Sequence, residues 1–412
     1  MKSANLLAFE RLTGARPVLV GCRRAGEVLP NFERNLILHS GPDVEFGKMR
    51  GPHRKGVVGA ALFEGLAKSE AEAGAMIERG EIRLAAANDW NSGAPGSGIT
   101  SYSMAVLVVK EKNSGIVAVA PPIEGEQGGG LGGWGVYDSD VHRNLEVIAS
   151  RYAPVFDAAL SACGGIDIAD LFAAGLQMGD DEHTRQVAGD KLFFSKMFDA
   201  VCKTDAPDAE KFAFLKFLNS SRRFVHHIGC ASAVAALKSA ANVPGATLVT
   251  AMCGNGVEFG IKTSGTGERW FTAPAPTFHG RYFSPEFGDA DSSPWLGDSS
   301  NVEAWGLGGL AAAAAPALLA ERGESLWSGI AQCEEMMRIT FGVNEHFRIP
   351  TLPDGFAPAG ILPERVVDSG IAPKMHGGIL SRVTGGQIGV GHARTPIECF
   401  RKALAANQFS IA

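Results

Sequence analysis

A glycine-dense segment from Gly254 to Pro276 predicts a β-hairpin that is followed at once by a second turn. The first turn is Asn255-Gly256, the dipeptide best suited to a tight connection between antiparallel strands. After it, apolar side chains alternate with polar ones, as in a strand that buries one face. The alternation places on one face Val257, Phe259 and Ile261, and on the other Glu258 and Lys262.

The second turn, Ser264-Gly265-Thr266-Gly267, brings polar and aromatic side chains close behind the hairpin. These side chains are Glu268, Arg269, Trp270 and Thr272. Backbone N–H groups of glycine-rich turns, together with a guanidinium, can bind a small anion. The alternative is a well-formed hairpin whose polar residues only face water. Residue types alone leave both interpretations open.

Length and charge narrow the class of protein. The chain has 412 residues, which exceeds the size at which a single hydrophobic core usually stops growing, so two or three domains are expected. Its 52 glycines follow no collagen-like period and predict many tight turns. A net charge of −6 argues against nucleic acid or an anionic membrane as the main partner. The small-apolar run from Leu307 to Ala320 is shorter than the roughly 20 residues that span a bilayer, so a buried helix is expected there.

The cysteines and the N-terminus predict a cytoplasmic location. The seven cysteines are scattered and contain no Cys-x-x-Cys pair, a pattern that indicates reduced thiols and no zinc framework. Glu10 and Arg11 interrupt the apolar residues near the start, so no signal peptide is expected.

Periodicity predicts a mixed α/β (α+β) multidomain fold, in which a helical domain is inserted between two α/β segments. Residues 1–140 carry strand signals at Pro17–Val20, Leu36–His39, Ile82–Ala87, Ala105–Val109 and Ile116–Ala120, with helices at Asn5–Leu12, Gly56–Lys68 and Ala71–Arg79. In residues 141–243 apolar side chains recur three or four apart, which is typical of helices. Strands return in residues 244–412, with helices at Leu310–Arg322 and Ser325–Thr340 and a glycine-rich tail after Ile371.

A GxGxxG match at Gly130–Gly135 is rejected as a dinucleotide site. That site needs a strand directly before the glycines and a helix directly after them. Pro121-Pro122 separates the preceding strand from the glycines, and Val136 to Asp138 start no convincing helix. We expect a flexible or substrate-covering loop instead.

Three neighbouring residues offer metal ligands, Asp180, Glu182 and His183. Asp180 and His183 lie about one helical turn apart, so both could reach one ion. The alternative is that Asp180 caps a helix, with Asp181 and Glu182 in its first turn. Helix capping by Asp167 is expected for the same reason. No cofactor is predicted, and a metal ion is retained only as the weaker alternative.

Two polar loops are further candidates. Asn88 to Ser97 follow a strand, where α/β folds commonly hold ligands; Asp89 there could be a general base or could close an Asx turn. Asp298, Ser299 and Ser300 precede a small-residue helix, whose free N–H groups could bind a phosphate or carboxylate. No Gly-x-Ser-x-Gly elbow, Walker loop or His-Glu-x-x-His helix occurs in the sequence, which argues against those enzyme classes.

Taken together, these segments resemble the AllG/YlbE/YahG-like family along nearly the whole chain. The most specific match is Gly267-Glu268-Arg269-Trp270-Phe271-Thr272-Ala273-Pro274. Further matches are His39-Ser40-Gly41-Pro42, Leu62-Phe63-Glu64-Gly65, Asn91 with Pro95, Met178-Gly179-Asp180 with His183 and Arg185, Asn255-Gly256, Gly297-Asp298-Ser299, Glu303, and Gln387-Ile388-Gly389.

The resemblance implies carbamoyl transfer. The best-understood member of the family is a subunit of oxamate carbamoyltransferase, which works beside two other subunits and interconverts oxalurate plus phosphate with oxamate plus carbamoyl phosphate. On this basis the expected partners are a small carboxylic-acid substrate and either other transferase subunits or further copies of the chain. The candidate catalytic residues are His183, Asp89 and Glu268. The candidate substrate- and anion-binding residues are Arg269, Lys262, Asn255, Asn91, Asp298, Ser299, Thr272 and His39.

Two departures from the family pattern bear on this activity. Relatives typically carry Cys-His-His where this chain has Ala87-Asn88-Asp89, and basic residues where it has Gly130 and Gly133. Loss of imidazoles and cations should weaken phosphate binding and change proton transfer. Three hypotheses therefore follow: a carbamoyltransferase-like enzyme or subunit, a non-catalytic assembly subunit, and a metal-dependent amide hydrolase or lyase.

Overall fold

An antiparallel sheet from the first part of the chain forms one wall of the core. The computed structural model describes residues 3–124, 130–352 and 355–409. The sheet has the order β5-β4-β1-β6, and its strands are Pro17–Arg24 (β1), Ala105–Glu111 (β4), Val117–Ala120 (β5) and Ile166–Asp167 (β6). The first three confirm predicted strands, because their Val, Leu and Ala side chains are largely buried, as β-branched and apolar runs favour.

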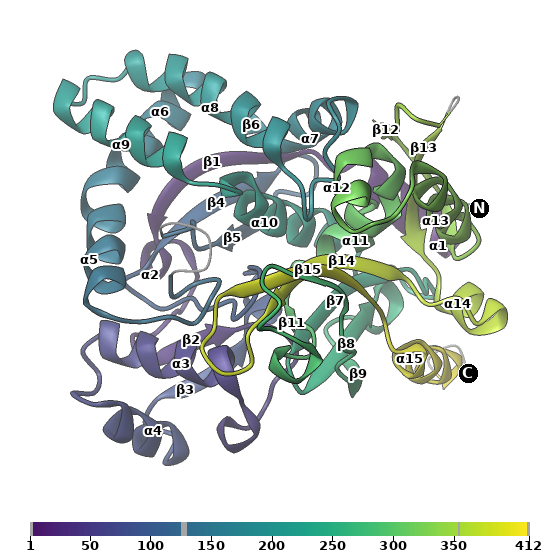
Figure 1. Ribbon diagram of the computed structural model, residues 1–412, viewed down its shortest axis with the longest axis horizontal. Coiled ribbons are helices and arrows are strands. Elements are labelled where there is room, and N and C mark those ends of the chain that lie inside the picture. Colours follow the sequence, from purple (N-terminus) through teal and green to yellow (C-terminus); the bar gives the residue numbers. More distant parts are fainter. Residues whose placement is uncertain (1–2, 125–129, 353–354, 410–412) are drawn as a thin grey trace.

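A parallel strand pair lies beside this sheet and carries its own helices (Figure 1). The elements of this region are α2 (Ala25–Val28), β2 (Leu36–His39), α3 (Gly51–Phe63), α4 (Glu70–Glu78) and β3 (Arg83–Ala86), whereas α1 (Ala4–Thr13) lies on the opposite side of the molecule. Helix α3 starts earlier than predicted, since Pro52 fits the first turn of a helix, where its missing N–H costs nothing. Its apolar face joins α4 in a separate small cluster that includes Val57 and Ile77.

A run of helices occupies the middle of the chain, as predicted. They are α5 (Ser139–Val147), α6 (Ala153–Cys163), α7 (Ile168–Gln177), α8 (Val187–Cys202), α9 (Asp208–Ser220) and α10 (Phe224–Ser239). Asp167 caps α7 by accepting from the amide of Asp170, which confirms the predicted cap. Helix α10 is buried at every residue from Phe224 to Leu237, and in Figure 1 it lies at the centre of the molecule beside β4 and β5.

The predicted hairpin forms the middle of a second antiparallel sheet. Its order is β11-β7-β8-β9, with strands at Val249–Asn255 (β7), Glu258–Thr263 (β8), Phe271–Pro274 (β9) and Leu296–Gly297 (β11). Phe259 and Ile261 are fully buried, which confirms the predicted apolar face. The opposite face of the strand was expected to be exposed to water, but Lys262 on that face is buried as well.

The rest of the chain closes the molecule around α10. Its strands are β10 (His279–Tyr282), β12 (Thr340–Arg348), β13 (Phe356–Ile361), β14 (Lys374–Leu380) and β15 (Gln387–Arg394). Its helices are α11 (Asn301–Trp305), α12 (Pro316–Glu321), α13 (Leu326–Met337), α14 (Pro363–Ser369) and α15 (Ile397–Phe409). Strands β14 and β15 form a ribbon across the face of the molecule in Figure 1.

One expectation for this part of the chain is wrong. The single helix predicted at Leu310–Arg322 is a 3₁₀ segment, Gly308–Ala314, followed by α12. Pro316 starts α12 because proline lacks the N–H that a continuous helix would need there. The glycine-rich tail contains the strand pair β14–β15, in which Gly377 faces Gly391. These strands could not be recognised from alternating polarity, because glycine has no side chain to show the alternation.

The main apolar core includes residues of all three predicted segments, from Ala8 through Ile228 to Ala403. Because the three segments share one core, the predicted division into domains at residues 140 and 243 stays a prediction. Among the helices of the described residues, none combines the length and the apolar character needed to cross a bilayer.

Candidate active site

A narrow cavity lies where the start of α10, the turn before α11 and strand β14 meet. Its volume is about 30 Å³, enough for one or two water molecules. The polar side chains that line it are His183, Arg223, His226 and Ser299, and aromatic and glycine residues complete the wall. Largely apolar walls with a few converging polar groups are typical of ligand sites, although this cavity is much smaller than the several hundred Å³ of most of them.

His183 presents one edge of its ring to this cavity and is held by Glu303 at the other. The Nδ1 atom lies 2.6 Å from Oε1 of Glu303, and both side chains are buried. Glu303 Oε1 also accepts from the backbone amides of His376 and Gly309, at 3.0 and 3.1 Å. With Nδ1 donating to the carboxylate, we assign the lone pair to Nε2, the nitrogen on the free edge. Burial raises the pKa of Glu303, and the neighbouring His183 opposes that rise.

A glycine allows the chain to pass close to this pair. Gly308 has φ +55°, and a Cβ atom there would lie 2.4 Å from Oε1 of Glu303 and 2.8 Å from Cβ of His183. Any side chain would therefore push the carboxylate away from the imidazole. Both the backbone conformation and the contact distance require glycine at this position.

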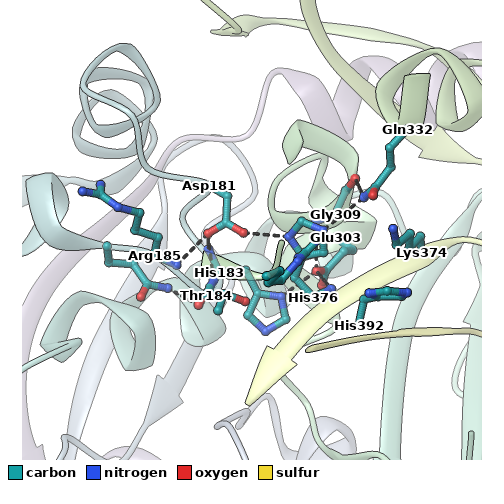
Figure 2. Close-up of polar contacts among 12 residues, drawn as sticks. Asp181, His183, Thr184, Arg185, Glu303, Gly309, Gln332, Lys374, His376 and His392 are labelled. Atoms are coloured by element: carbon teal, nitrogen blue, oxygen red, sulfur yellow. Dashed lines mark hydrogen bonds and ion pairs between the residues drawn. The ribbon is translucent and has the colours of Figure 1, made fainter. Parts of the chain in front are cut away.

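Asp181 fixes the loop that carries His183 (Figure 2). Its Oδ1 accepts from the backbone amides of His183, Thr184 and Arg185, at 3.1, 2.8 and 2.8 Å. Its Oδ2 lies 2.9 Å from Nδ1 of His376 on β14. Burial alone would raise the pKa of Asp181, but these hydrogen bonds and the nearby histidines lower it to about 2. Burial lowers the pKa of His376 to about 4, so at neutral pH a neutral imidazole donates to a carboxylate.

His226 stacks on His183 from the first turn of α10. The ring centres are 5.2 Å apart and the planes differ by 14°. Its Nδ1 lies 2.9 Å from the side-chain amide of Gln186, and burial lowers its pKa well below the usual value. The adjacent His227 instead faces the carbonyl of Pro121 at 2.7 Å. Only the first of these two neighbouring imidazoles lines the cavity.

Arg223 lies at the mouth of the cavity. Its guanidinium donates to Oε1 of Gln387 at 3.0 Å and to the carbonyl of His183 at 3.2 Å, both neutral acceptors. No carboxylate of the described residues lies within ion-pair distance of it. Its backbone is left-handed, with φ 62°, and Asp190 holds it there by accepting its amide at 2.6 Å. An unneutralised cation is therefore held next to His183.

The structure also brings together three of the predicted residues in a different place. Lys262 is buried and donates to Asp89 at 2.5 Å and to Glu268, and its ammonium lies 4.5 Å from the ring of Trp270. Lys238 adds a second cation to Glu268 at 2.7 Å. This cluster explains why Lys262 can be buried, because two carboxylates and an aromatic face replace the hydration of its ammonium group. None of these side chains lines the His183 cavity.

Arg269, the predicted anion-binding cation, is exposed and lies over the ring of Phe271 at 5.1 Å. Asn255 stabilises its own turn, because its Oδ1 accepts from the amides of Val257 and Glu258. Thr272 donates to Glu258 at 3.1 Å on the edge strand. Asn255 also donates through Nδ2 to the carbonyl of Pro42 at 3.0 Å, so the three residues serve the packing of the hairpin.

The other predicted residues are Ser299, Asp298, His39 and Asn91, and only the first of them lines the cavity. Ser299 lines the cavity, whereas the adjacent Asp298 accepts from the amide of Gly41 at 2.7 Å, and burial raises its pKa to about 7. The ring of His39 faces its own loop, with Nδ1 2.9 Å from the carbonyl of Ser40. Asn91 adopts a left-handed conformation at the end of a 3₁₀ turn, Ala87–Trp90. The predicted set thus does not converge in one pocket.

The three residues proposed as metal ligands point in different directions. Asp180 accepts from the amides of Val187, Ala188 and Gly189 at the start of α8, but the N-cap position of that helix is Gln186, so the predicted cap at Asp180 is wrong. The helix begins at Val187, so Asp181 and Glu182 lie in the preceding loop and not in the first turn. Glu182 is buried against Gly175, and burial raises its pKa well above the usual value. Over residues 3–124, 130–352 and 355–409, no cluster of three or more acidic, histidine or cysteine side chains is placed to hold a metal ion.

The glycine loop packs against the body of the protein. Burial raises the pKa of Glu124 to about 7, and its carboxyl group accepts from the amides of Leu131 and Gly132. Gly130 has φ +123°, and a Cβ atom there would lie 2.3 Å from Oε2 of Glu124. The carbonyl of Gly133 accepts from the amide of Ser97. These glycines allow close backbone packing, and this part of the loop is not the free flap that the sequence suggested.

Sequence reasoning missed Arg223, Glu303, Asp181 and His376 as parts of the site. Glu303 belonged to a family motif, and its spacing from Ser299 was the available signal. The Arg222-Arg223 pair before an apolar helix was visible too. Their convergence on His183 depends on contacts across 40 to 195 residues, which no local pattern shows.

Comparison with known proteins identifies relatives along the whole chain. Residues 82–299 match the family described as oxamate carbamoyltransferase subunit AllG. The oxamate carbamoyltransferase subunit AllG of Escherichia coli K12 is 35% identical over 407 residues, which cover 98% of this chain and 96% of the relative. The uncharacterised protein YahG of the same organism is 34% identical over 403 residues, covering 98% and 85%. The crystal structure of a conserved protein of unknown function from Enterococcus faecalis V583 superposes with a TM-score of 0.95 at 33% identity, covering 99% of this chain and 98% of that one.

Proposed function

The chain belongs to the family of the oxamate carbamoyltransferase subunit AllG, and from this premise we propose that it transfers a carbamoyl group between phosphate and a small amide-bearing carboxylic acid of the oxamate type. We place the reaction in the His183 cavity. The observation that carries this proposal is a buried imidazole–carboxylate pair beside a cation that has no carboxylate partner.

Arg223 is the group proposed to bind the carboxylate of the acid. A guanidinium matches a carboxylate with two parallel N–H donors, and this one has neutral acceptors as its present partners. A ligand carboxylate would therefore gain the full charge of the arginine. Ser299, on the opposite wall, can orient the amide end of the acid through its hydroxyl group.

His183 is the proposed proton carrier. In the direction that consumes oxalurate, a phosphate oxygen bonds to the carbamoyl carbon and the bond from that carbon to the oxamate nitrogen breaks. Nε2 of His183 takes the proton from the phosphate and delivers it to the departing nitrogen, so that oxamate and carbamoyl phosphate result. Glu303 stabilises the imidazolium during the transfer, the role that a buried carboxylate has beside a catalytic histidine. The reverse direction uses the same steps in the opposite order.

We further propose that the chain acts in the cytoplasm, within a complex that contains the other transferase subunits. Relationship to a protein named as a subunit supports this partnership. The small volume of the cavity agrees with it, since about 30 Å³ is less than a molecule of oxamate requires. Assembly with partners would then widen the cavity, and the chain alone would turn over slowly.

The test is carbamoyl phosphate formation from oxalurate and phosphate, measured with the chain alone and with the chain co-expressed with its partner subunits. The variant His183→Asn keeps a hydrogen bond to Glu303 possible but cannot carry a proton. We expect at least a 100-fold loss of kcat, the scale of general acid–base catalysis. His142→Asn, at a half-buried position of α5 where the imidazole contacts Tyr137 and Glu146 and does not line the cavity, is the matched control and should keep full activity. Full activity of the His183 variant would refute the assignment.

A further inference from the structure

A wide cleft opens on the outer side of Arg223. Its volume is about 770 Å³, and its walls come from the start of α8, the turn between α9 and α10, and strand β15. Arg223 lines both this cleft and the His183 cavity. We call it the Arg222 cleft, after the exposed arginine next to Arg223 on its wall. Its position makes it the approach to the proposed reaction site.

The Arg222 cleft carries cations that have no carboxylate partner. Lys191, Arg222 and Arg223 all line it, and in the part of the chain that the structure describes none of them forms an ion pair. Lys191 has only a long contact, 3.4 Å, to the side-chain oxygen of Asn219. Nε of Arg223 is buried without a partner among the described residues. Unsatisfied donors on a buried guanidinium are costly unless a ligand meets them.

The acidic residues of the cleft offset this charge only in part, through the electrostatic interaction of Asp190 with Arg223. Both carboxylate oxygens of Asp190 are taken by the amides of Arg223 and Val225, at 2.6 and 3.0 Å. Glu321 is exposed on the far wall. The cleft still presents three cations that form no ion pair among the described residues, from two neighbouring elements, α8 and the turn before α10. Such an arrangement favours a compact dianion over a single carboxylate.

We propose that the Arg222 cleft binds a phosphate dianion, with Arg222 and Lys191 as its ligands and Arg223 shared with the acid in the inner cavity. This inference rests on the proposed function and deepens it, because it assigns the second substrate to residues outside the cavity. The proposal also needs no basic side chains at Gly130 and Gly133, because the cations of the cleft come from α8 and from the turn before α10.

The test measures phosphate binding without turnover, by calorimetric titration of the full chain with inorganic phosphate at constant ionic strength. We expect Arg222→Glu and Lys191→Glu each to weaken phosphate binding at least tenfold. Lys110→Glu makes the same charge change at an exposed position of β4 and should bind phosphate as the unmodified protein does. A phosphoserine peptide, titrated in parallel, should bind no better than inorganic phosphate.

The outcomes separate this inference from the proposed function. Phosphate binding that depends on Arg222 and Lys191, in a protein that transfers no carbamoyl group, supports the cleft and refutes the function. Carbamoyl transfer that persists when both variants bind phosphate normally refutes the cleft. Absence of phosphate binding to the unmodified protein, equal loss in the Lys110 variant, or tighter binding of the phosphopeptide would also overturn the inference.

Discussion

Replacing Asp181 by asparagine tests whether its charge holds the His183 loop in place. Asparagine keeps an oxygen that can accept the three backbone amides of residues 183–185. It removes the negative charge and reverses the polarity of the contact with His376. The variant therefore isolates the ionic part of the interaction from the hydrogen bonds to the backbone.

The size of the effect follows from the pKa. The pKa of Asp181 falls from an ordinary 3.8 to about 2 in the folded protein, and each pKa unit corresponds to about 1.4 kcal/mol. Folding thus favours the carboxylate by roughly 2–3 kcal/mol at pH 7. A lowered carboxyl pKa stabilises the fold above the unfolded value and loses its effect as pH falls through the folded value. The contribution should be intact at pH 6, about half as large near pH 3, and nearly absent at pH 2.

Urea unfolding, followed by tryptophan fluorescence at pH 7 and pH 3, measures this contribution. We expect Asp181→Asn to lower the free energy of unfolding by roughly 2–3 kcal/mol at pH 7 and by about half that at pH 3. The control is Asp199→Asn at an exposed position of α8, which should change little at either pH. An Asp181 variant as stable as the control at pH 7, or a difference that does not shrink in acid, would refute the reasoning.

Two further substitutions test packing around the two polar clusters, each by calorimetric unfolding. Gly308→Ala should lower stability by at least 2 kcal/mol more than Gly323→Ala, because both have positive φ but only the first would place Cβ against Glu303; equal losses would contradict the close contact. Lys262→Met should cost about 1–2 kcal/mol, since it leaves two half-exposed carboxylates facing each other without their shared cation; a stabilised variant would contradict this.

Local patterns in the sequence predicted the local structure well. Alternation identified the hairpin after Asn255-Gly256 and the buried strands of the first sheet, because a period of two is visible wherever side chains differ in polarity. Asp167 was recognised as a helix cap from residue type alone. His183 and Ser299 were chosen as functional candidates, and both line the cavity.

The arrangement of the site could not be predicted from local sequence patterns. Arg269 stands in the most specific motif of the chain, yet its side chain faces outward from the edge of the sheet. Arg223 has no motif around it, and its place depends on a left-handed backbone and on the burial of α10. Glu303 meets His183 across 120 residues. Pairings of this range arise from how sheets and helices pack, and sequence periodicity carries no information on them.

The most direct test of the account is the affinity for oxamate of two arginine variants, measured by calorimetric titration of the assembled complex. Arg223→Ala should weaken oxamate binding at least tenfold, because a charge-assisted hydrogen bond to the carboxylate contributes about 1.5–3 kcal/mol. Arg269→Ala removes the same side chain from the exposed hairpin and should leave the dissociation constant unchanged. The opposite pattern, with normal binding by the Arg223 variant and loss in the Arg269 variant, would show that the acid binds at the hairpin and not beside His183.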